Sequence, residues 1–289
     1  MVNRKAGLRG KLEPKSFGLK YVHEYGLESD KGFPESLDVT RGITDWGMLG
    51  NGPDPTLTVH GGQPVGDCVV AGTVHNRMSK LSSYHEPTSD EVVQSYLDFT
   101  GGVDSGINMA DWFKHLFDTG QIKGFAPVDF SSRMNLESAM AEFDGVLLGV
   151  QLPADADQQF EEGLPWTFDN SPTAGGHCVV LVKYDNTSSM DTVVTWGALQ
   201  NAQVGWERVV DEAWVILTQE DLDRLGSKAD ALLADLRALP GSVSSTESIA
   251  IPPEVESFAF DLVIKELEAI AEHLIKVIEK LHQHKGKSI

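Results

Sequence analysis

The spacing of apolar residues in the first half of the chain predicts helices. Between Val69 and Ser83 they recur at roughly helical intervals: Val70, Val74, Met78 and Leu81. This helix is expected to begin at or just after Asp67 and Cys68, with Asp67 as its N-cap. Residues 88–91 match a capping box ahead of an apolar stretch, and residues 108–119 are amphipathic, so two further helices are expected.

The pattern changes in the second half. Short apolar or β-branched runs bounded by turn residues predict strands of one sheet, at 145–150, 178–184, 192–196 and 213–217. A helical pattern returns over 219–239. Helices followed by strands, without strict alternation, indicate an α+β domain in which a helical layer packs on a sheet.

The two ends of the chain have patterns of their own. Residues 1–45 are rich in Gly, Lys and Pro and lack periodicity, which predicts an N-terminal arm laid over a partner or over its own domain, or else a loose tail. Residues 241–253 are typical of a linker, and residues 254–289 are expected to form an amphipathic helix.

The apolar stripe of this last helix alternates spacings of three and four: Phe260, Val263, Leu267, Ile270, Leu274, Val277 and Leu281. This spacing is that of a coiled-coil seam over about three heptads. Leu at the first seam position with Val or Ile at the second disfavours a simple parallel dimer. Residues 260–281 therefore predict a homo-oligomer or docking to another protein. The alternative is a single helix that packs on its own domain.

Composition limits the classes of partner expected for this protein. The 289-residue chain has a formal net charge of -20, which argues against nucleic acid and anionic membranes as partners. No apolar run of about 18 residues and no signal peptide are seen, so a cytoplasmic or virion location is expected. With two cysteines and no recognisable zinc spacing, we expect no disulfide framework, no metal and no cofactor.

Two segments carry candidate chemistry. Cys68 lies in the run 66–72 at the predicted helix start, and His177 opens a predicted strand. The helix N-terminus lowers the pKa of a thiol, and a neighbouring histidine holds it as a thiolate. Gln63, shortly before the cysteine, is a candidate oxyanion donor together with the Cys68 backbone N–H. This is the outline of a cysteine hydrolase.

Trp196 follows the histidine segment. Residues 193–197 come after a polar turn at 185–189, so this run is expected to pair with the histidine strand as a hairpin. The indole would then shield His177 from water, or serve as a plain core aromatic.

The order of Gln63, Cys68, His177 and the pair Trp196-Gly197 resembles the papain-like cysteine peptidases. With residues 46–51 upstream and His75 after the cysteine, the chain is similar to a group of papain-like proteins found in bacteriophages and bacteria. The resemblance spans roughly residues 46–240. It implies a papain-like α+β fold, a cysteine-hydrolase ancestry and a phage origin.

The sequence departs from that family at two points. Val194 stands where the family has the asparagine that orients the histidine, so Thr195, Gln200 or Asn201 would have to replace it. Gln63 is also one residue nearer its cysteine than is usual in the family.

Two functions are therefore expected. The first is a papain-like cysteine hydrolase that acts on an amide bond of a protein or peptide, with Cys68, His177 and Gln63 as its catalytic residues. The alternative is a catalytically silent virion structural or decoration protein that assembles with other virion proteins through its terminal segments.

Overall fold

The computed structural model describes residues 7–12, 17–28, 34–81, 84–167 and 173–242. All of them belong to one compact unit, Met1–Ser242. The helix expected over 254–289, with its coiled-coil seam, and nearly all of the expected linker lie outside the described residues.

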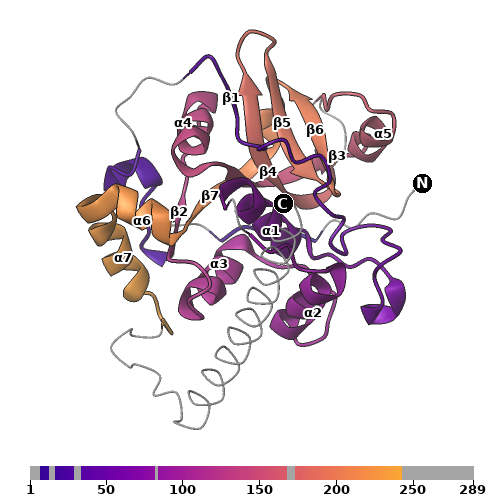
Figure 1. The fold of residues 1–289 in the computed structure, drawn as a ribbon, viewed down its shortest axis with the longest axis horizontal. Helices are drawn as coiled ribbons and strands as arrows, with labels where there is room; N and C mark the ends of the chain where they lie inside the picture. The colour runs from indigo at the N-terminus through magenta and orange to yellow at the C-terminus, as the bar shows by residue number, and fades with distance from the viewer. Residues whose placement is uncertain (1–6, 13–16, 29–33, 82–83, 168–172, 243–289) are drawn as a thin grey trace, which may run out of the picture. The chain divides into compact units, whose positions relative to one another are not determined.

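Seven strands in the described part of the chain form one antiparallel sheet, in the order β2-β7-β3-β4-β5-β6 with β1 against β4 (Figure 1). Their bounds are β1 Ser36–Asp38, β2 Gly124–Pro127, β3 Val146–Pro153, β4 Thr173–Asp185, β5 Met190–Thr195, β6 Ala198–Gln203 and β7 Val210–Leu217. The four predicted strand regions are confirmed as β3, β4, β5 and β7. The expected hairpin is confirmed as β4 and β5.

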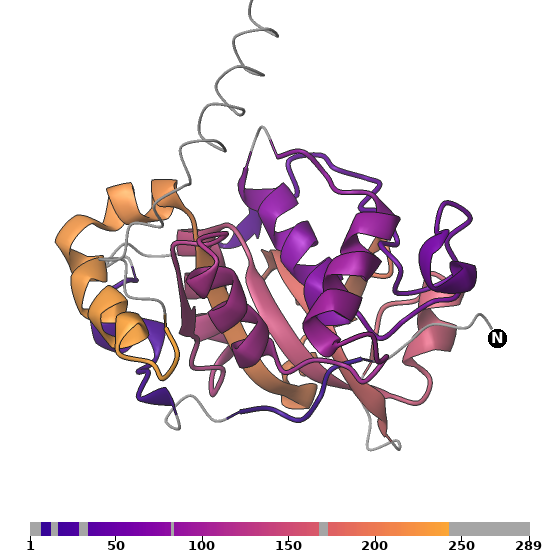
Figure 2. The same cartoon turned by 90° about the horizontal axis from the view of Figure 1, so that it is seen from below.

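Helices make up the rest of the fold: α1 Cys68–Lys80, α2 Ser89–Thr100, α3 Met109–Asp118, α4 Arg133–Phe143, α5 Ala156–Glu161, α6 Gln219–Leu225 and α7 Asp230–Arg237. Short 3-10 turns occur at Val22–Tyr25, Val59–Gly62, Trp206–Val209 and Gly226–Ala229. Figures 1 and 2 both place α6 and α7 at the opposite end of this unit from α5. The result is the α+β fold class that the sequence predicts.

Helix α1 is the centre of the fold. Arg77 is its one residue that is not buried, because neighbours surround the helix on all sides. It approaches β4 so closely that a Cβ on Gly72 would lie 2.9 Å from Sγ of Cys178. The Trp112 indole of α3 donates to Oγ1 of Thr73 at 3.1 Å and joins the two helices. This packing brings the first residue of α1 to the strand that carries His177.

The other predicted helices also form. The capping box is confirmed, since Thr88 Oγ1 accepts from the Glu91 backbone while the Glu91 carboxylate accepts from the Thr88 backbone. The helical pattern over 219–239 becomes α6, a 3-10 turn and α7, with Gly226 at a φ of 55° between them. Towards the N-terminus, β1 pairs with β4, and Leu19, Val22 and Leu27 are buried in the same core.

Candidate active site

Cys68 is the first residue of α1 and is 2% exposed. The preceding residue, Asp67, is the N-cap by position, but its side chain makes no capping bond and accepts from Asn51 Nδ2 at 3.3 Å. Burial raises the pKa of Asp67 well above its usual range, and the hydrogen bond from Asn51 opposes that shift. The loop before the helix is held by Asp104, which accepts from the Gly66 N–H at 2.8 Å.

His177 lies on β4 opposite Val150 of β3 and is 1% exposed. A hydrogen bond of 2.8 Å joins its Nε2 to Oγ1 of Thr195. The Trp196 ring stacks on the imidazole, with centroids 5.0 Å apart and planes 25° from parallel. Nδ1 is buried and has no hydrogen-bond partner among the described residues. Thr195 thus fixes the ring from one nitrogen and leaves the other available to a reacting group.

Trp196 reaches the histidine through an unusual turn. Trp196 and Gly197 connect β5 to β6 with φ values of 46° and 76°. Two positive φ angles are typical of a type I′ hairpin turn, in which a bulky residue is rare and costs roughly 1–3 kcal/mol. Gly197 is required for a second reason, since a Cβ there would lie 3.0 Å from the Gly47 backbone. The rings of Phe160 and Trp166 pack edge-on against Trp196 at 5.1 Å and 5.9 Å and hold it in place.

Cys68 contacts β4 next to His177, but the two side chains do not form an ion pair. The backbone of Cys178, the residue after His177, hydrogen-bonds the Cys68 thiol. Burial nevertheless raises the pKa of Cys68 to about 12. Burial also lowers the pKa of His177 to about 3, with a smaller contribution from the charge of His75. At pH 7 the thiol and the imidazole are both neutral, and no hydrogen bond joins them within the described residues.

A segment from the N-terminus covers this site. We call residues 7–12 the strap. The Leu8 N–H donates to the carbonyl of Gly176 at 3.1 Å, directly before His177. Ile107 exchanges two backbone bonds of 2.9 Å with the strap, donating to Gly7 and accepting from Arg9.

The strap also reaches Cys68. A backbone hydrogen bond from Gly7 is directed at the Cys68 thiol. A Cβ on Gly7 would lie 1.9 Å from the carbonyl oxygen of Gly66, so only glycine fits here. Burial is the largest cause and raises the pKa of Cys68, while the Gly7 hydrogen bond lowers it. The strap thus covers the thiol and at the same time donates to it.

The other candidate residues have different surroundings. Gln63 is exposed and makes no side-chain hydrogen bond within the described residues, so its oxyanion role stays a prediction. Cys178 is a buried strand residue with a free thiol. Gln200 donates to the Leu164 carbonyl and Asn201 accepts from Thr192, which leaves Thr195 as the residue bonded to His177.

The sequence predicted an N-terminal arm laid over a partner or over its own domain, but not that residues 7–12 lie at the candidate site. The contacts of the strap are main-chain bonds, which leave no periodic pattern in the sequence. The available signal was compositional, because basic residues and glycines cluster at the start of an acidic chain.

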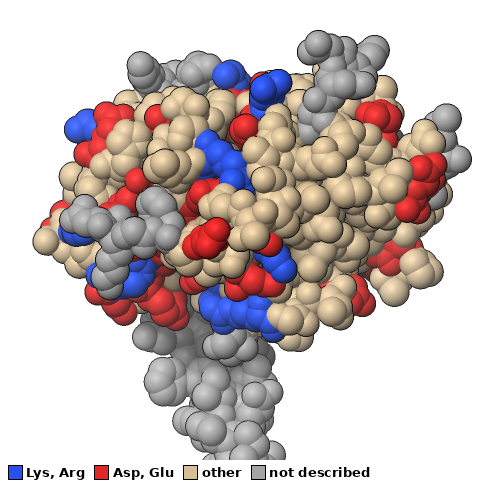
Figure 3. Space-filling model, turned by 90° about the horizontal axis from the view of Figure 1, so that it is seen from above, with Lys and Arg blue, Asp and Glu red and all other residues tan. Residues whose placement is uncertain are grey.

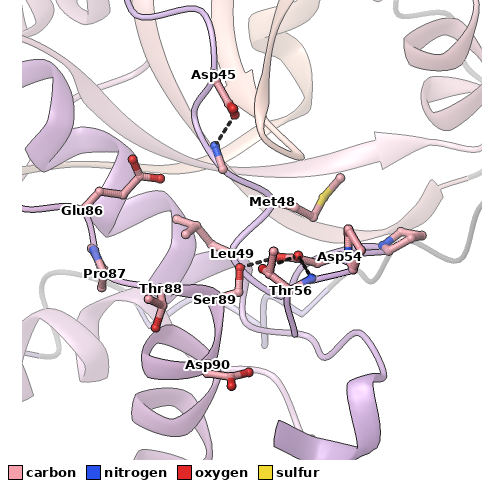
Figure 4. Close-up of a pocket in the computed structure, with 13 residues that line it drawn as sticks. Asp45, Met48, Leu49, Asp54, Thr56, Glu86, Pro87, Thr88, Ser89 and Asp90 are labelled. Atoms are coloured by element: carbon pink, nitrogen blue, oxygen red, sulfur yellow. Dashed lines mark hydrogen bonds between the residues drawn. The ribbon is translucent and has the colours of Figure 1, made fainter. Parts of the chain in front are cut away.

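One hollow of the surface is lined by other residues. A cavity of about 630 Å³ is bounded by the loop 45–56 and the start of α2 (Figure 4). Its acidic side chains bond to their neighbours: Asp54 accepts from Thr56 and Ser89, and Asp90 accepts from Thr58. Neither Cys68 nor His177 lines it, so it is not part of the candidate active site.

The described residues contain neither a grouped set of metal-binding side chains nor a membrane-spanning helix. Within them no three His, Cys, Asp or Glu side chains are grouped as a metal site would need. Nor does any helix there have the length and apolarity needed to span a bilayer.

Comparison with known proteins gives a likeness in fold. Neither the protein-family models nor the curated protein sequences gave a match. Among solved structures, xylellain, a cysteine protease from Xylella fastidiosa, is similar with a TM-score of 0.54 and 15% identity, over 75% of this chain and 98% of that one.

Digestive procathepsin L2 proteinase from the larval midgut of Tenebrio molitor is similar with a TM-score of 0.52 and 15% identity, over 74% of this chain and 78% of that one. At this identity the likeness concerns the fold. The chain therefore has the α+β fold of the papain-like cysteine proteases, with Cys68 at the start of its central helix and His177 on the adjoining strand.

Proposed function

We propose that this protein is a papain-like cysteine hydrolase that cleaves an amide bond in a protein or peptide. Cys68 is the nucleophile, His177 is the base and then the acid, and Gln63 assists at the oxyanion. The observation that best supports the proposal is the fixed imidazole. Thr195 and Trp196 hold the His177 ring beside the strand residue whose backbone contacts Cys68.

The arrangement of His177 suits a general base. With Nε2–H donating to Thr195 Oγ1, the proton of the neutral ring is on Nε2 and the lone pair is on Nδ1. Nδ1 then accepts the thiol proton, and the Cys68 sulfur attacks the amide carbonyl carbon. The C–N bond breaks as the imidazolium returns its proton to the leaving nitrogen, which leaves a thioester on Cys68. Water, deprotonated by His177, attacks the thioester and releases the acid and the free thiol.

Displacement of the strap is a part of this proposal. A thiol with a pKa of about 12 is a poor nucleophile at pH 7, and burial is the largest cause of the shift. Water in place of Gly7 would remove part of that burial and would donate to the thiol in place of the Gly7 N–H, which lowers the pKa of Cys68. The helix N-terminus and His177 would then favour the thiolate.

The test is direct hydrolysis. Full-length protein is incubated with a mixture of unfolded proteins, and new peptide termini are identified by mass spectrometry. We expect cleavage by the wild type or by a strap-displaced variant, and none by Cys68→Ala or His177→Ala. Absence of any Cys68-dependent cleavage in both forms would contradict the proposal.

A second function is favoured by the neutral, covered thiol. We propose as the alternative a catalytically silent virion structural or decoration protein of phage origin, which keeps the papain-like fold and assembles through its terminal segments. The periodic residues 260–281 would then determine the oligomer.

The alternative is tested by assembly. Leu267→Asp and Leu274→Asp are introduced together into the full-length chain, and the native mass is measured by light scattering. If the alternative holds, the wild type has the mass of a multimer and the double variant has a lower native mass. The same native mass in both would show that this segment does not direct assembly.

A further inference from the structure

Helix α1 begins without the side-chain cap that its sequence offers. An aspartate placed before a helix usually accepts from the backbone N–H of the second or third helical residue. The Asp67 carboxyl makes no such bond, while its backbone carbonyl accepts from Val70 at 2.8 Å and from Ala71 at 3.0 Å. The start of the helix therefore has its backbone bonds but not the carboxyl that would cover its N–H groups.

A buried asparagine binds this carboxyl instead. The Nδ2 group of Asn51 donates to Oδ1 of Asp67 at 3.3 Å and to the Val65 carbonyl at 3.5 Å. Asn51 is 3% exposed and Asp67 is 0% exposed. Since both side chains are closed to water, their hydrogen bond fixes where the carboxyl lies.

The backbone of the loop 45–56 packs against the other carboxyl oxygen. A Cβ on Gly50 would lie 2.8 Å from Oδ2 of Asp67 and 2.2 Å from Cγ2 of Val93 in α2, and the φ of Gly50 is 87°. The Gly50 carbonyl accepts from the Val65 N–H at 3.1 Å, which joins this loop to the run before α1. Oδ2 itself has no hydrogen-bond partner within the described residues. Gly50 and Asn51 thus form a slot that holds the Asp67 carboxyl.

The place of the carboxyl matters because Cys68 is the next residue. The positive end of the α1 dipole stabilises a thiolate, and the N–H groups there bind an oxyanion. A capping carboxyl would accept from those N–H groups, and such bonds favour its charged form. Burial is the largest cause that raises the pKa of Cys68, and the charge of Asp67 raises it further. A carboxylate at the cap would therefore oppose both the thiolate and the oxyanion.

The surroundings of the slot disfavour a negative charge on Asp67. Burial is the largest cause that raises its pKa, and the charge of Asp104 adds to the shift, while the bond from Asn51 opposes it. Asp104 accepts from the Gly66 N–H at 2.8 Å, directly before Asp67. The carboxyl is thus kept in a place where ionisation beside Cys68 is costly.

We propose that Asn51 is a positioning residue for the candidate nucleophile: it binds the Asp67 carboxyl in the slot and keeps it off the N-terminus of α1. The helix N–H groups and dipole then act on the Cys68 sulfur and on the oxyanion. The part of this inference that concerns the oxyanion rests on the proposed hydrolase function, and the part that concerns the thiol does not.

Alkylation of Cys68 tests the inference without a substrate. The rate is measured against pH by peptide mass spectrometry in full-length Gly7→Val, which uncovers the thiol, and in the same chain with Asn51→Leu, with Asp67→Asn, and with both. Asn51→Leu keeps the approximate shape of the side chain and removes its hydrogen bonds. Asp67→Asn keeps an acceptor for Asn51 and cannot be charged. Thr56→Val is the matched control, since it removes a hydroxyl hydrogen bond of 2.6 Å within the same loop.

We expect Asn51→Leu to move the inflection upward by about one pH unit or more and to slow labelling at pH 7 about tenfold, because the released carboxyl caps α1 beside the sulfur. Asp67→Asn, alone or added to Asn51→Leu, should label like the parent chain, since no charge then reaches the helix. A loosened loop would not be repaired by Asp67→Asn. An unchanged pH profile in Asn51→Leu, or an upward shift that persists in the double variant, would overturn the inference.

Two replacements keep the test valid if a variant does not fold. Asn51→Ala removes the same donor with a smaller side chain. Chains that retain Gly7 are compared by their labelling rates at pH 9, where the same order of rates is expected and equal rates would overturn the inference. Cleavage of unfolded proteins is scored separately: the pH profiles can follow this prediction when no cleavage is found, and Cys68-dependent cleavage can occur when they do not.

Discussion

At the scale of single residues, the hydroxyl of Thr195 is the contact that orients the candidate base. It bonds Nε2 of His177 at 2.8 Å, one position after Val194, which cannot form this bond. The hydroxyl belongs to the last residue of β5, one residue after the position of the family's asparagine. The sequence left three residues open for this role, because a hydrogen bond between strands depends on register.

Thr195→Val tests this contact. The variant keeps the shape of the side chain and removes the hydroxyl, so His177 loses its fixed tautomer and orientation. A hydrogen bond to a charged group is worth about 1.5–3 kcal/mol, so the rate of Cys68-dependent hydrolysis should fall roughly 10- to 100-fold. Thr195→Ser should retain most of the rate. Equal rates in Thr195→Val and wild type would show that Thr195 does not position the base.

His75 and His177 predict sensitivity to acid. Burial lowers their pKa values from 6.5 to about 4 and about 3, so between those values and pH 6.5 the unfolded chain binds protons that the folded chain does not. Their contribution to stability is complete above pH 6.5 and is lost as the pH falls, by up to about 1.4 kcal/mol per pH unit for each histidine.

The measurement is urea unfolding between pH 7 and pH 4. His75→Gln retains a donor for the Gly47 carbonyl and should make the loss of stability with acid shallower. The control His85→Gln changes an exposed histidine and should leave the slope unchanged. The same slope in His75→Gln and wild type would contradict the assignment of His75 as a neutral, buried group.

At the scale of elements, both ends of α1 are held by contacts that the sequence did not indicate. At its C-terminal end, Lys80 Nζ lies 3.0 Å from Asp221 of α6 and donates to the Ile216 carbonyl of β7 at 2.6 Å. Both side chains are buried, and burial lowers the pKa of Lys80 while Asp221 opposes the shift. This pair joins α1 to the end of the sheet.

Asp221→Asn leaves the Lys80 ammonium buried without its counter-charge and should cost about 3–5 kcal/mol of unfolding free energy. Adding Lys80→Met should restore part of that loss, because no charge then remains to be compensated. A double-mutant cycle in urea measures the coupling. Additive losses in the two single variants would show that the pair does not act as a unit.

At the N-terminal end of α1, the strap covers Cys68. Gly7→Val should displace it and raise the rate of Cys68 alkylation at pH 8 by at least tenfold, since the thiol becomes accessible and burial no longer holds its pKa at about 12. Gly10→Val is the matched control, because a Cβ on Gly10 meets nothing within 4 Å. If both variants label at the wild-type rate, the strap does not control access.

The elements that the sequence predicted have an apolar pattern of their own, such as helical spacing in α1 and α3 and a continuous apolar run in β4. Strand β6 was missed because it is largely polar and lies at the edge of the sheet, where it forms by pairing with β5. Helix α4 was missed because it exposes Met134 and contains small residues, so its two faces differ little. The pairing of β6 with β5 cannot be predicted from the pattern of side chains along one strand.

At the scale of the whole molecule, net charge and local charge are different quantities. Acidic and basic side chains are interspersed on the face shown in Figure 3, although the chain as a whole carries -20. The sequence placed Cys68 and His177 correctly within the fold, at a helix start and on a strand. It could not predict the neutral state of the pair, because that state depends on burial by distant segments.

The central claim is that Cys68 and His177 form an activatable pair, and the pH dependence of Cys68 alkylation tests it most directly. The rate is measured by peptide mass spectrometry in full-length Gly7→Val, with and without His177→Ala, and with Cys178 as the internal buried thiol. We predict an inflection well below the ordinary thiol pKa of about 8.5 that moves upward when His177 is removed. Labelling that rises only near or above pH 8.5 in both variants would contradict the claim.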